Sequence, residues 1–127
     1  MSLSSSKIAA NVPVSDLNRA VAFYREKLGL NVMPLTDWLA VALADDGSLL
    51  ALARRPTPPT DQDIANFTVT DIKGTVKELK GKGVAFENYD LPYLKTVDHI
   101  AQQDGFSAAW FKDSEGNLLQ INQSPAR

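Results

Sequence analysis

The sequence predicts an α+β protein built from two tandem βαβββ modules, and three observations support this prediction. A strand, an Asp helix cap, a helix and a glycine stop occur twice, beginning at Val12-Pro13-Val14-Ser15-Asp16 and at Phe67-Thr68-Val69-Thr70-Asp71. The turn before the last strand is also repeated, because Asp46-Gly47-Ser48-Leu49 aligns with Glu115-Gly116-Asn117-Leu118. A proline-rich segment, residues 55–61, separates the two copies and predicts a semi-rigid linker.

The first copy reads as a strand, a helix and three further strands. Residues 7–14 alternate in the manner of a strand. Asp16 then caps a helix whose apolar residues recur at helical spacing, and Gly29 ends it. That buried stripe is Leu17, Ala20, Val21, Tyr24 and Leu28. Three short apolar runs separated by turn residues predict strands over 30–35, 38–44 and 49–54.

The second copy repeats this order. We expect a strand over 64–69, a helix capped by Asp71 and ended by Gly81 and Gly83, and a closing hairpin formed by 106–112 and 117–123. Residues 84–87 are expected to start the strand that follows the helix. Residues 88–105 show no clean periodicity, and we interpret them as a long irregular insertion, which in a compact domain is usually functional or mobile.

Length and composition favour an ordinary soluble domain. The 127 residues predict one domain over 7–127, made of halves 7–54 and 62–123, with residues 1–6 as a loose arm or scar. The net charge of −2 gives no reason to expect nucleic acid or a membrane surface as partner. The absence of cysteine excludes disulfides and thiolate chemistry, and the N-terminus lacks signal-peptide features, so we expect a cytoplasmic protein.

These signatures resemble the vicinal-oxygen-chelate superfamily, which includes glyoxalase I, extradiol dioxygenases and bleomycin-resistance proteins. The matching elements are Val12–Leu17 with Ala22-Phe23-Tyr24 and Leu28-Gly29-Leu30, Val69–Ile72 with Gly83-Val84, and Trp110–Leu119. The resemblance implies a curved, cup-shaped mixed sheet with the helices outside and a ligand in the cup. It also implies a homodimer, and it leaves open whether the cup closes within one chain or across two.

The resemblance does not extend to the metal site of that superfamily. Its enzymes hold a divalent metal through side chains that correspond here to Ala9, Ala51, Ile64 and Gln120. The first three have no donor atom, and one amide oxygen is a poor ligand when it acts alone. We therefore expect no metal, no cofactor and no catalytic residue of the usual kind.

Strand parity predicts the residues that line the cup. Val12, Val14, Leu50, Leu52, Phe67, Val69, Leu119 and Ile121 would face the helices. The opposite face would present neutral amides and hydroxyls, which bind a ligand by hydrogen bonds but do little acid–base chemistry. These predicted ligand-binding residues are Asn11, Asn66, Thr68, Gln120 and Asn122.

Aromatic residues and the single histidine complete the candidate site. Trp38, Trp110, Tyr89 and Tyr93 could form an apolar wall and lid, although core packing or dimer contact explains each tryptophan about equally well. His99 could act as a general base, but one histidine without a paired nucleophile or second ligand is more often a surface or gate residue.

The leading hypothesis is metal-independent binding of a small, partly aromatic molecule in the cup. This resembles sequestration by bleomycin-resistance proteins, by stoichiometric capture without covalent chemistry. The alternative is a glyoxalase- or dioxygenase-like lyase or isomerase that uses a non-standard metal site, such as Gln120 with His99 or Glu87, or no metal at all. A third possibility is a regulatory or structural protein whose cup is vestigial.

Overall fold

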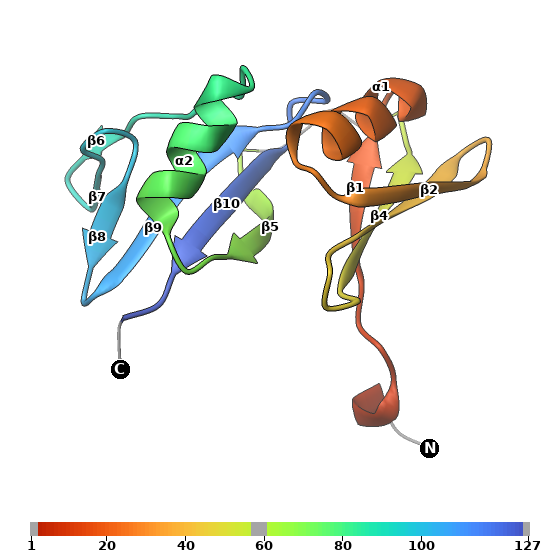
Figure 1. The fold of residues 1–127 in the computed structure, drawn as a ribbon, viewed down its shortest axis with the longest axis horizontal. Coiled ribbons are helices and arrows are strands. Elements are labelled where there is room, and N and C mark those ends of the chain that lie inside the picture. Colours follow the sequence, from red (N-terminus) through yellow and green to blue (C-terminus); the bar gives the residue numbers. More distant parts are fainter. Residues whose placement is uncertain (1–2, 57–60, 126–127) are drawn as a thin grey trace. The chain divides into compact units, whose positions relative to one another are not determined.

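The computed structural model describes residues 3–56 and 61–125, and it divides the chain into two compact units, residues 1–57 and 58–127. Each unit contains one βαβββ module (Figure 1). The predicted linker 55–61 lies partly outside the described residues. The prediction that the two halves form one domain stays a prediction.

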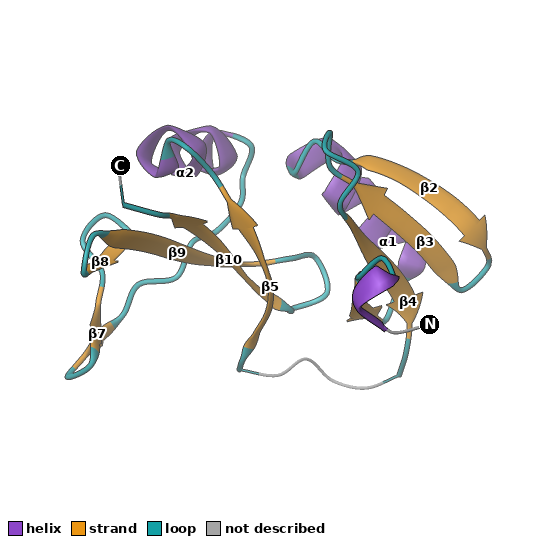
Figure 2. Ribbon diagram, turned by 90° about the horizontal axis from the view of Figure 1, so that it is seen from below, coloured by secondary structure: helices purple, strands orange, loops and turns teal. Residues whose placement is uncertain are grey.

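The first unit is a four-stranded sheet with a helix on one face (Figure 2). The strand order is β1-β4-β3-β2, in which β1 runs parallel to β4 and the other neighbours are antiparallel. A short 3₁₀ turn, Leu3–Ser5, precedes the sheet. The elements are β1 (Ala10–Val14), α1 (Leu17–Ala22), β2 (Asn31–Thr36), β3 (Leu39–Leu43) and β4 (Leu49–Arg54).

The second unit repeats this topology. Its strand order is β5-β10-β9-β8, with β5 parallel to β10, and helix α2 packs on β9 and β10 (Figure 1). The elements are β5 (Asp63–Thr68), α2 (Ile72–Gly81), β8 (Ala101–Gln103), β9 (Phe106–Lys112) and β10 (Leu118–Gln123), with an additional hairpin of β6 (Asp90–Leu91) and β7 (Leu94–Lys95). The predicted α+β class and the βαβββ order of both halves are confirmed.

The two predicted helix caps are confirmed. The Oδ1 atom of Asp16 accepts a hydrogen bond from the backbone N–H of Arg19 at 3.1 Å, and Oδ1 of Asp71 accepts one from Gly74 at 3.1 Å. Gly29 and Gly83 have φ angles of 72° and 90°, a left-handed conformation that glycine adopts without strain.

The first helix differs from the prediction in its last turns. We expected a regular helix to Leu28, but Phe23–Lys27 forms a π-helical segment, and the N–H of Leu28 bonds to the carbonyl of Phe23. The apolar stripe is buried as expected except for Leu28, which is half-buried. The wider π turn changes the angular spacing on which that expectation rested.

The segment expected to be irregular, 88–105, is more ordered than the sequence suggested. It contains the β6–β7 hairpin and strand β8, which pairs with β9. The strand expected to start over 84–87 is wrong, because Phe86 makes only an isolated bridge to Phe111 and β8 is the second strand of this module. The β8–β9 connection is the two-residue turn Asp104-Gly105, a typical hairpin turn.

Each unit has its own core between helix and sheet. The largest fully buried side chains are Tyr24, Phe111, Leu52, Leu119, Ile121, Val12 and Val14. Most residues predicted to face the helices are buried, whereas Leu50, Phe67 and Val69 are half-buried. The outer strand β2 carries Pro34 between the exposed side chains of Met33 and Leu35.

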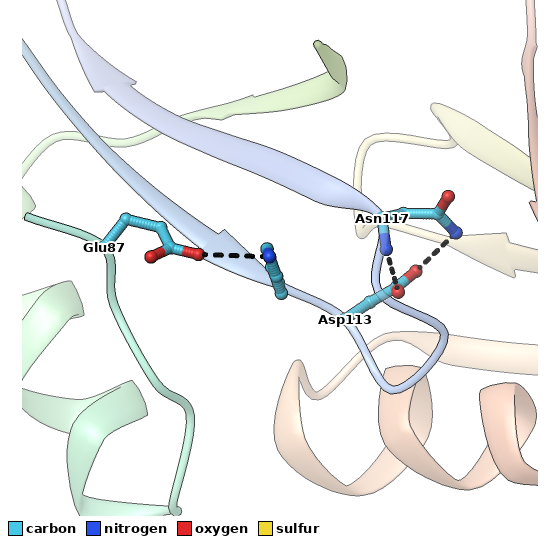
Figure 3. A network of polar contacts seen from close by, with 4 residues as sticks. Glu87, Asp113 and Asn117 are labelled. Atoms are coloured by element: carbon cyan, nitrogen blue, oxygen red, sulfur yellow. Dashed lines mark hydrogen bonds and ion pairs between the residues drawn. The ribbon is translucent and has the colours of Figure 1, made fainter. Parts of the chain in front are cut away.

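The last turn of the second unit is organised by a buried carboxylate. Oδ1 of Asp113 accepts hydrogen bonds from the backbone N–H groups of Glu115 and Asn117, at 2.8 and 2.9 Å. Its Oδ2 accepts one from the side-chain amide of Asn117 at 3.0 Å (Figure 3). Asp113 is therefore a turn-forming residue.

Candidate functional site

Polar side chains from neighbouring strands meet on the open face of the second sheet. The register places Gln120 of β10 between Asn66 of β5 and Trp110 of β9, and it pairs Asn122 with Thr68. The intervening residues of β10 are buried on the opposite face, toward α2. These five residues were all predicted as ligand-binding, and the structure brings them together.

Hydrogen bonds join the amides of this face into one network. The hydroxyl of Thr68 donates to Oδ1 of Asn122 at 2.9 Å. The Nδ2 atom of Asn122 donates to Oδ1 of Asn66 at 3.1 Å and to Oε1 of Gln120 at 2.9 Å. A connected network holds each amide in one orientation, so the face presents a fixed pattern of donors and acceptors.

The network ends on a carboxylate that sequence reasoning did not place there. Oδ2 of Asp63 accepts a hydrogen bond from Nε2 of Gln120 at 3.0 Å and another from the indole Nε1 of Trp110 at 3.2 Å. Oδ1 of Asp63 has no hydrogen-bond partner among the described residues. The face was expected to be neutral, and this expectation is wrong.

A β-bulge explains why strand parity missed Asp63. Leu119 pairs with Ala65, so a regular strand would pair Leu118 with Ile64. The register shifts at this point, and Leu118 pairs with Asp63 instead. An extra residue reverses the alternation and redirects the side chains that precede it. The residues around Ile64 contain no sequence signal that predicts such a bulge.

A groove of about 410 Å³ lies over this face. Trp110, Gln120 and Asn122 contribute the polar network to its wall, and β8, the start of β9 and the β6–β7 hairpin supply the rest. Its volume lies within the range of small-molecule sites, which are about 300–1,000 Å³. Phe106 is a lining residue that we did not predict, although its exposed aromatic ring next to a Gly turn is a sequence signal for one.

Tyr89 packs edge-on against Trp110, with ring centroids 5.4 Å apart and an interplanar angle of 89°. Burial raises the pKa of Tyr89, and the carboxylates of Glu87, Asp63 and Asp61 raise it further. The phenol therefore remains protonated. Glu87 forms an ion pair with Lys112 at 3.8 Å, whereas Asp63 has no cationic partner among the described residues.

The structure separates Tyr93 from His99. Tyr93 occupies the β6–β7 turn, is 80% exposed and lines the groove. His99 does not line it. Its ring lies 6.0 Å from that of Phe86, which packs on the buried Phe111, and its Nδ1 lies 3.4 Å from the carbonyl oxygen of Glu87. A role of His99 in binding stays a prediction.

Asn11 and Trp38 belong to the first unit. Asn11 is an exposed residue of β1 that pairs with Ala51, and Trp38 lies in the β2–β3 turn with 46% of its surface exposed. Their part in ligand binding stays a prediction.

The residues present do not fit a divalent metal site. Within residues 3–56 and 61–125, no three His, Asp or Glu side chains come together in a way that could hold a metal ion. At the corresponding positions of the first unit, Ala9 and Ala51 offer no donor atom. In the second unit Gln120 turns its nitrogen toward Asp63 and its oxygen toward Asn122, so its ligating atom is already engaged.

The chain is an α+β protein of two βαβββ modules. Each module has a helix on one face of its sheet and an open face opposite. Residues 8–121 match the model of the Glyoxalase/Bleomycin resistance protein/Dioxygenase superfamily. The chain belongs to this superfamily. No helix in the described part of the chain is long and apolar enough to cross a membrane.

The individual relatives are distant. The uncharacterized protein YraH of Bacillus subtilis (strain 168) is 27% identical, in a match that covers 85% of this chain and 90% of YraH. The crystal structure of TnmS3, an antibiotic-binding protein from Streptomyces sp. CB03234, gives a TM-score of 0.67 at 24% identity, with 93% of each chain covered. A lactoylglutathione lyase from Agrobacterium tumefaciens gives a TM-score of 0.68 at 19% identity, covering 94% of this chain and 93% of the lyase. These structural likenesses show a shared fold.

Proposed function

We propose that this protein binds a small, partly aromatic molecule without a metal, by stoichiometric noncovalent capture on the open face of the second sheet. The observation that carries the proposal is the network Trp110–Asp63–Gln120–Asn122 in and beside the groove. It combines a broad aromatic surface with fixed hydrogen-bonding groups, which is the composition of a ligand site. The antibiotic-binding TnmS3 has the same fold, and this agrees with the proposal.

Asp63 determines which ligands the site would prefer. Its Oδ1 atom is available as an acceptor, and Trp110 and Tyr89 supply aromatic faces and edges close to it. A carboxylate next to aromatic rings favours a ligand that carries an amino or other hydrogen-bond-donating group on an aromatic ring system. The site would therefore take a flat amine more tightly than a carboxylic acid of the same shape.

The test uses matched pairs of aromatic amines and aromatic carboxylic acids in a thermal-shift screen. A ligand that binds only the folded state raises the melting temperature by mass action. Binding would then be measured by quenching of Trp110 fluorescence in a Trp38→Phe background, where Trp110 is the one remaining tryptophan. We expect amines to bind and the acids to bind more weakly or not at all.

Two variants test the residues. Asp63→Asn keeps the shape and one oxygen to accept from Gln120 and Trp110, but it removes the charge and turns the free acceptor into an NH2 donor. It should therefore weaken binding of amines about tenfold while leaving neutral aromatic ligands without a donor group nearly unchanged. Trp110→Ala should weaken both classes, as followed by the thermal shift, because this variant lacks the fluorescent reporter. Binding that is unaffected by both substitutions would contradict the proposed site, and a tightly bound stoichiometric metal in the purified protein would contradict the metal-independent mechanism.

A further inference from the structure

A second groove of the same half is basic. It has a volume of about 630 Å³ and lies between α2 and the segment from β7 to β8. Lys73, Lys77 and Lys80 of α2 and Lys95 of β7 line it, and Asp98 is the one acidic residue among its described lining residues. The groove therefore carries an excess of positive charge, in contrast to the Asp63 face.

The lysines of α2 lower the stability of the helix, because they repel one another. Lys73 and Lys77 are four residues apart and Lys77 and Lys80 three, so like charges are neighbours on one helix face. Lys73 also lies in the first turn, where a positive charge opposes the helix dipole. Glu78, which could relieve this repulsion, instead pairs with Lys82 at 3.8 Å, and neither lines the groove.

The four ammonium groups are available. All four lysines are exposed, and within the described residues none of their ammonium groups forms a hydrogen bond or an ion pair. Side chains that stabilised the fold would be expected to have acidic partners in the chain. Because these four unpaired charges line one groove, they could bind an anion from outside the chain.

The groove also has an apolar part. Val97 is 76% exposed, and Val76 of α2 and the half-buried Ile100 lie beside the lysines. A ligand with only charged groups would leave this surface unused. The lining therefore suits an anion that carries an organic group.

We propose that this groove binds an organic polyphosphate. Lys73 and Lys80 are seven residues apart on α2, which corresponds to about 10 Å along the helix axis. One carboxylate or phosphate would reach only part of this row, whereas a chain of phosphates offers several negative charges at separate points. Lysine binds phosphate as a point charge, and Val97 and Ile100 would contact the organic group.

The experiment titrates isotope-labelled full-length protein with inorganic tripolyphosphate, adenosine triphosphate and adenosine monophosphate, and follows backbone amide shifts. We expect the triphosphates to move amides of residues 72–81 and 94–102, and the monophosphate to bind at least tenfold more weakly. The affinity for triphosphate should fall as the salt concentration rises. Adenosine triphosphate should bind more tightly than tripolyphosphate if the apolar lining contributes.

A matched pair of variants separates a site from a general effect of charge. Lys77→Gln removes one charge from the groove and should weaken triphosphate binding about fivefold. Lys82→Gln removes one charge from the C-terminal end of the same helix, outside the groove, and should leave the affinity within twofold. Equal weakening by both variants, or no binding at millimolar tripolyphosphate, would overturn the proposal.

One further result would replace the ligand class. In this result a single-stranded oligonucleotide binds more tightly than adenosine triphosphate, and it binds more weakly to Lys77→Gln. In that case the groove would be a nucleic-acid surface and the polyphosphate proposal would be wrong. Lys95 and Gln102 line both grooves, so shifts over residues 94–102 alone do not distinguish this groove from the one over the Asp63–Trp110 face. The shifts over residues 72–81 and the effect of Lys77→Gln do distinguish them, because Lys77 lines the basic groove and not the other.

Discussion

Asp113 is a buried residue that holds the β9–β10 turn together through its side-chain hydrogen bonds. It is 6% exposed and accepts hydrogen bonds from two backbone N–H groups and the buried side chain of Asn117. The first half builds the same turn with Ala44 at the equivalent position and Ser48 opposite it. The backbone turn thus tolerates alanine, and the buried amide of Asn117 is what requires the carboxylate.

Replacing Asp113 with Ala should lower the free energy of unfolding by about 2 to 3 kcal/mol, because the amide of Asn117 and two N–H groups lose their acceptor. Urea denaturation followed by circular dichroism would measure this. The double variant Asp113→Ala/Asn117→Ser copies the residues of the first half and should recover part of the loss. A single variant as stable as the parent would show that water replaces the carboxylate.

Asp46 lies in the equivalent turn of the first half and, unlike the buried Asp113, its side chain is exposed. The Ser48 hydroxyl, which donates to Oδ1 at 2.6 Å, lowers the pKa of Asp46 below its ordinary value of 3.8, and the Ser48 backbone N–H lowers it further. A lowered folded-state pKa stabilises the protein above the ordinary value, and this contribution is lost as the pH falls through the folded-state pKa.

Substituting Ser48 with Ala should raise the pKa of Asp46 back toward 3.8, as measured by a carboxyl NMR titration. Ser114→Ala, which changes the equivalent turn of the second half, should leave the Asp46 titration unchanged. If the pKa of Asp46 did not respond to Ser48→Ala, the hydroxyl would not be the cause of the shift.

At the scale of elements, the π-helical segment accounts for the main difference between the two modules. Asp16 and Gly29 are thirteen positions apart, whereas Asp71 and Gly83 are twelve apart. Both pairs cap and end a helix that starts and finishes in the same way. The first module therefore accommodates one additional residue, and the π turn over Phe23–Lys27 absorbs it.

Deleting the exposed residue Glu26 should therefore be tolerated, with a change of about 1 kcal/mol or less in the free energy of unfolding, because a regular helix then spans the same distance. Deleting Lys77 from α2 is the control. It rotates Leu79 away from the core and should cost about 2 kcal/mol or more. A severe loss on deletion of Glu26 would mean that the π turn itself is required for packing.

The helix boundaries could be predicted from the sequence, because residues next to each boundary determine it. The two Asp caps and the glycine stops at Gly29 and Gly83 depend on neighbouring residues, and these were predicted correctly. Strand β8 was missed because it has only three residues and a weak pattern. The Asp104-Gly105 dipeptide was the available signal, since both residues adopt positive φ angles in a tight hairpin turn.

The candidate site was predictable only as far as strand alternation holds. Alternation placed Gln120, Asn122, Asn66 and Thr68 on one face, and the structure agrees. Asp63 lies beyond a bulge, and His99 lies in a turn with a φ angle of 73°, so neither position follows from a period of two. The long-range hydrogen bond from Trp110 to Asp63 depends on this bulge, so it could not be predicted from the sequence.

At the scale of the whole molecule, the duplicated modules have diverged in chemistry more than in topology. The open face of the second sheet carries amides and a carboxylate, whereas the corresponding face of the first sheet is mainly apolar, with Val41, Ala51 and Met33 in register. The same strand order therefore presents different side chains in the two modules. The cup and the homodimer implied by the resemblance stay predictions.

The oligomeric state can be tested directly by sedimentation equilibrium of the full-length protein. We expect a mass of two chains, and the apolar first-half face gives a reason for it, because exposed apolar area is removed from water on association. Met33→Lys would place a charge on that face and should weaken a dimer, whereas Lys112→Gln in the second half should not. A monomer at all concentrations would contradict the expectation.

Pro34 has a consequence for how copies of this protein behave when crowded together. The outer strand β2 presents Met33 and Leu35 to solvent, a pattern that ordinarily invites a strand from another molecule to add to the sheet and start an aggregate. Proline has no N–H to donate, so a foreign strand meets a gap in the ladder at this point. Pro34 therefore lowers the tendency of this apolar edge to pair with a strand of another molecule.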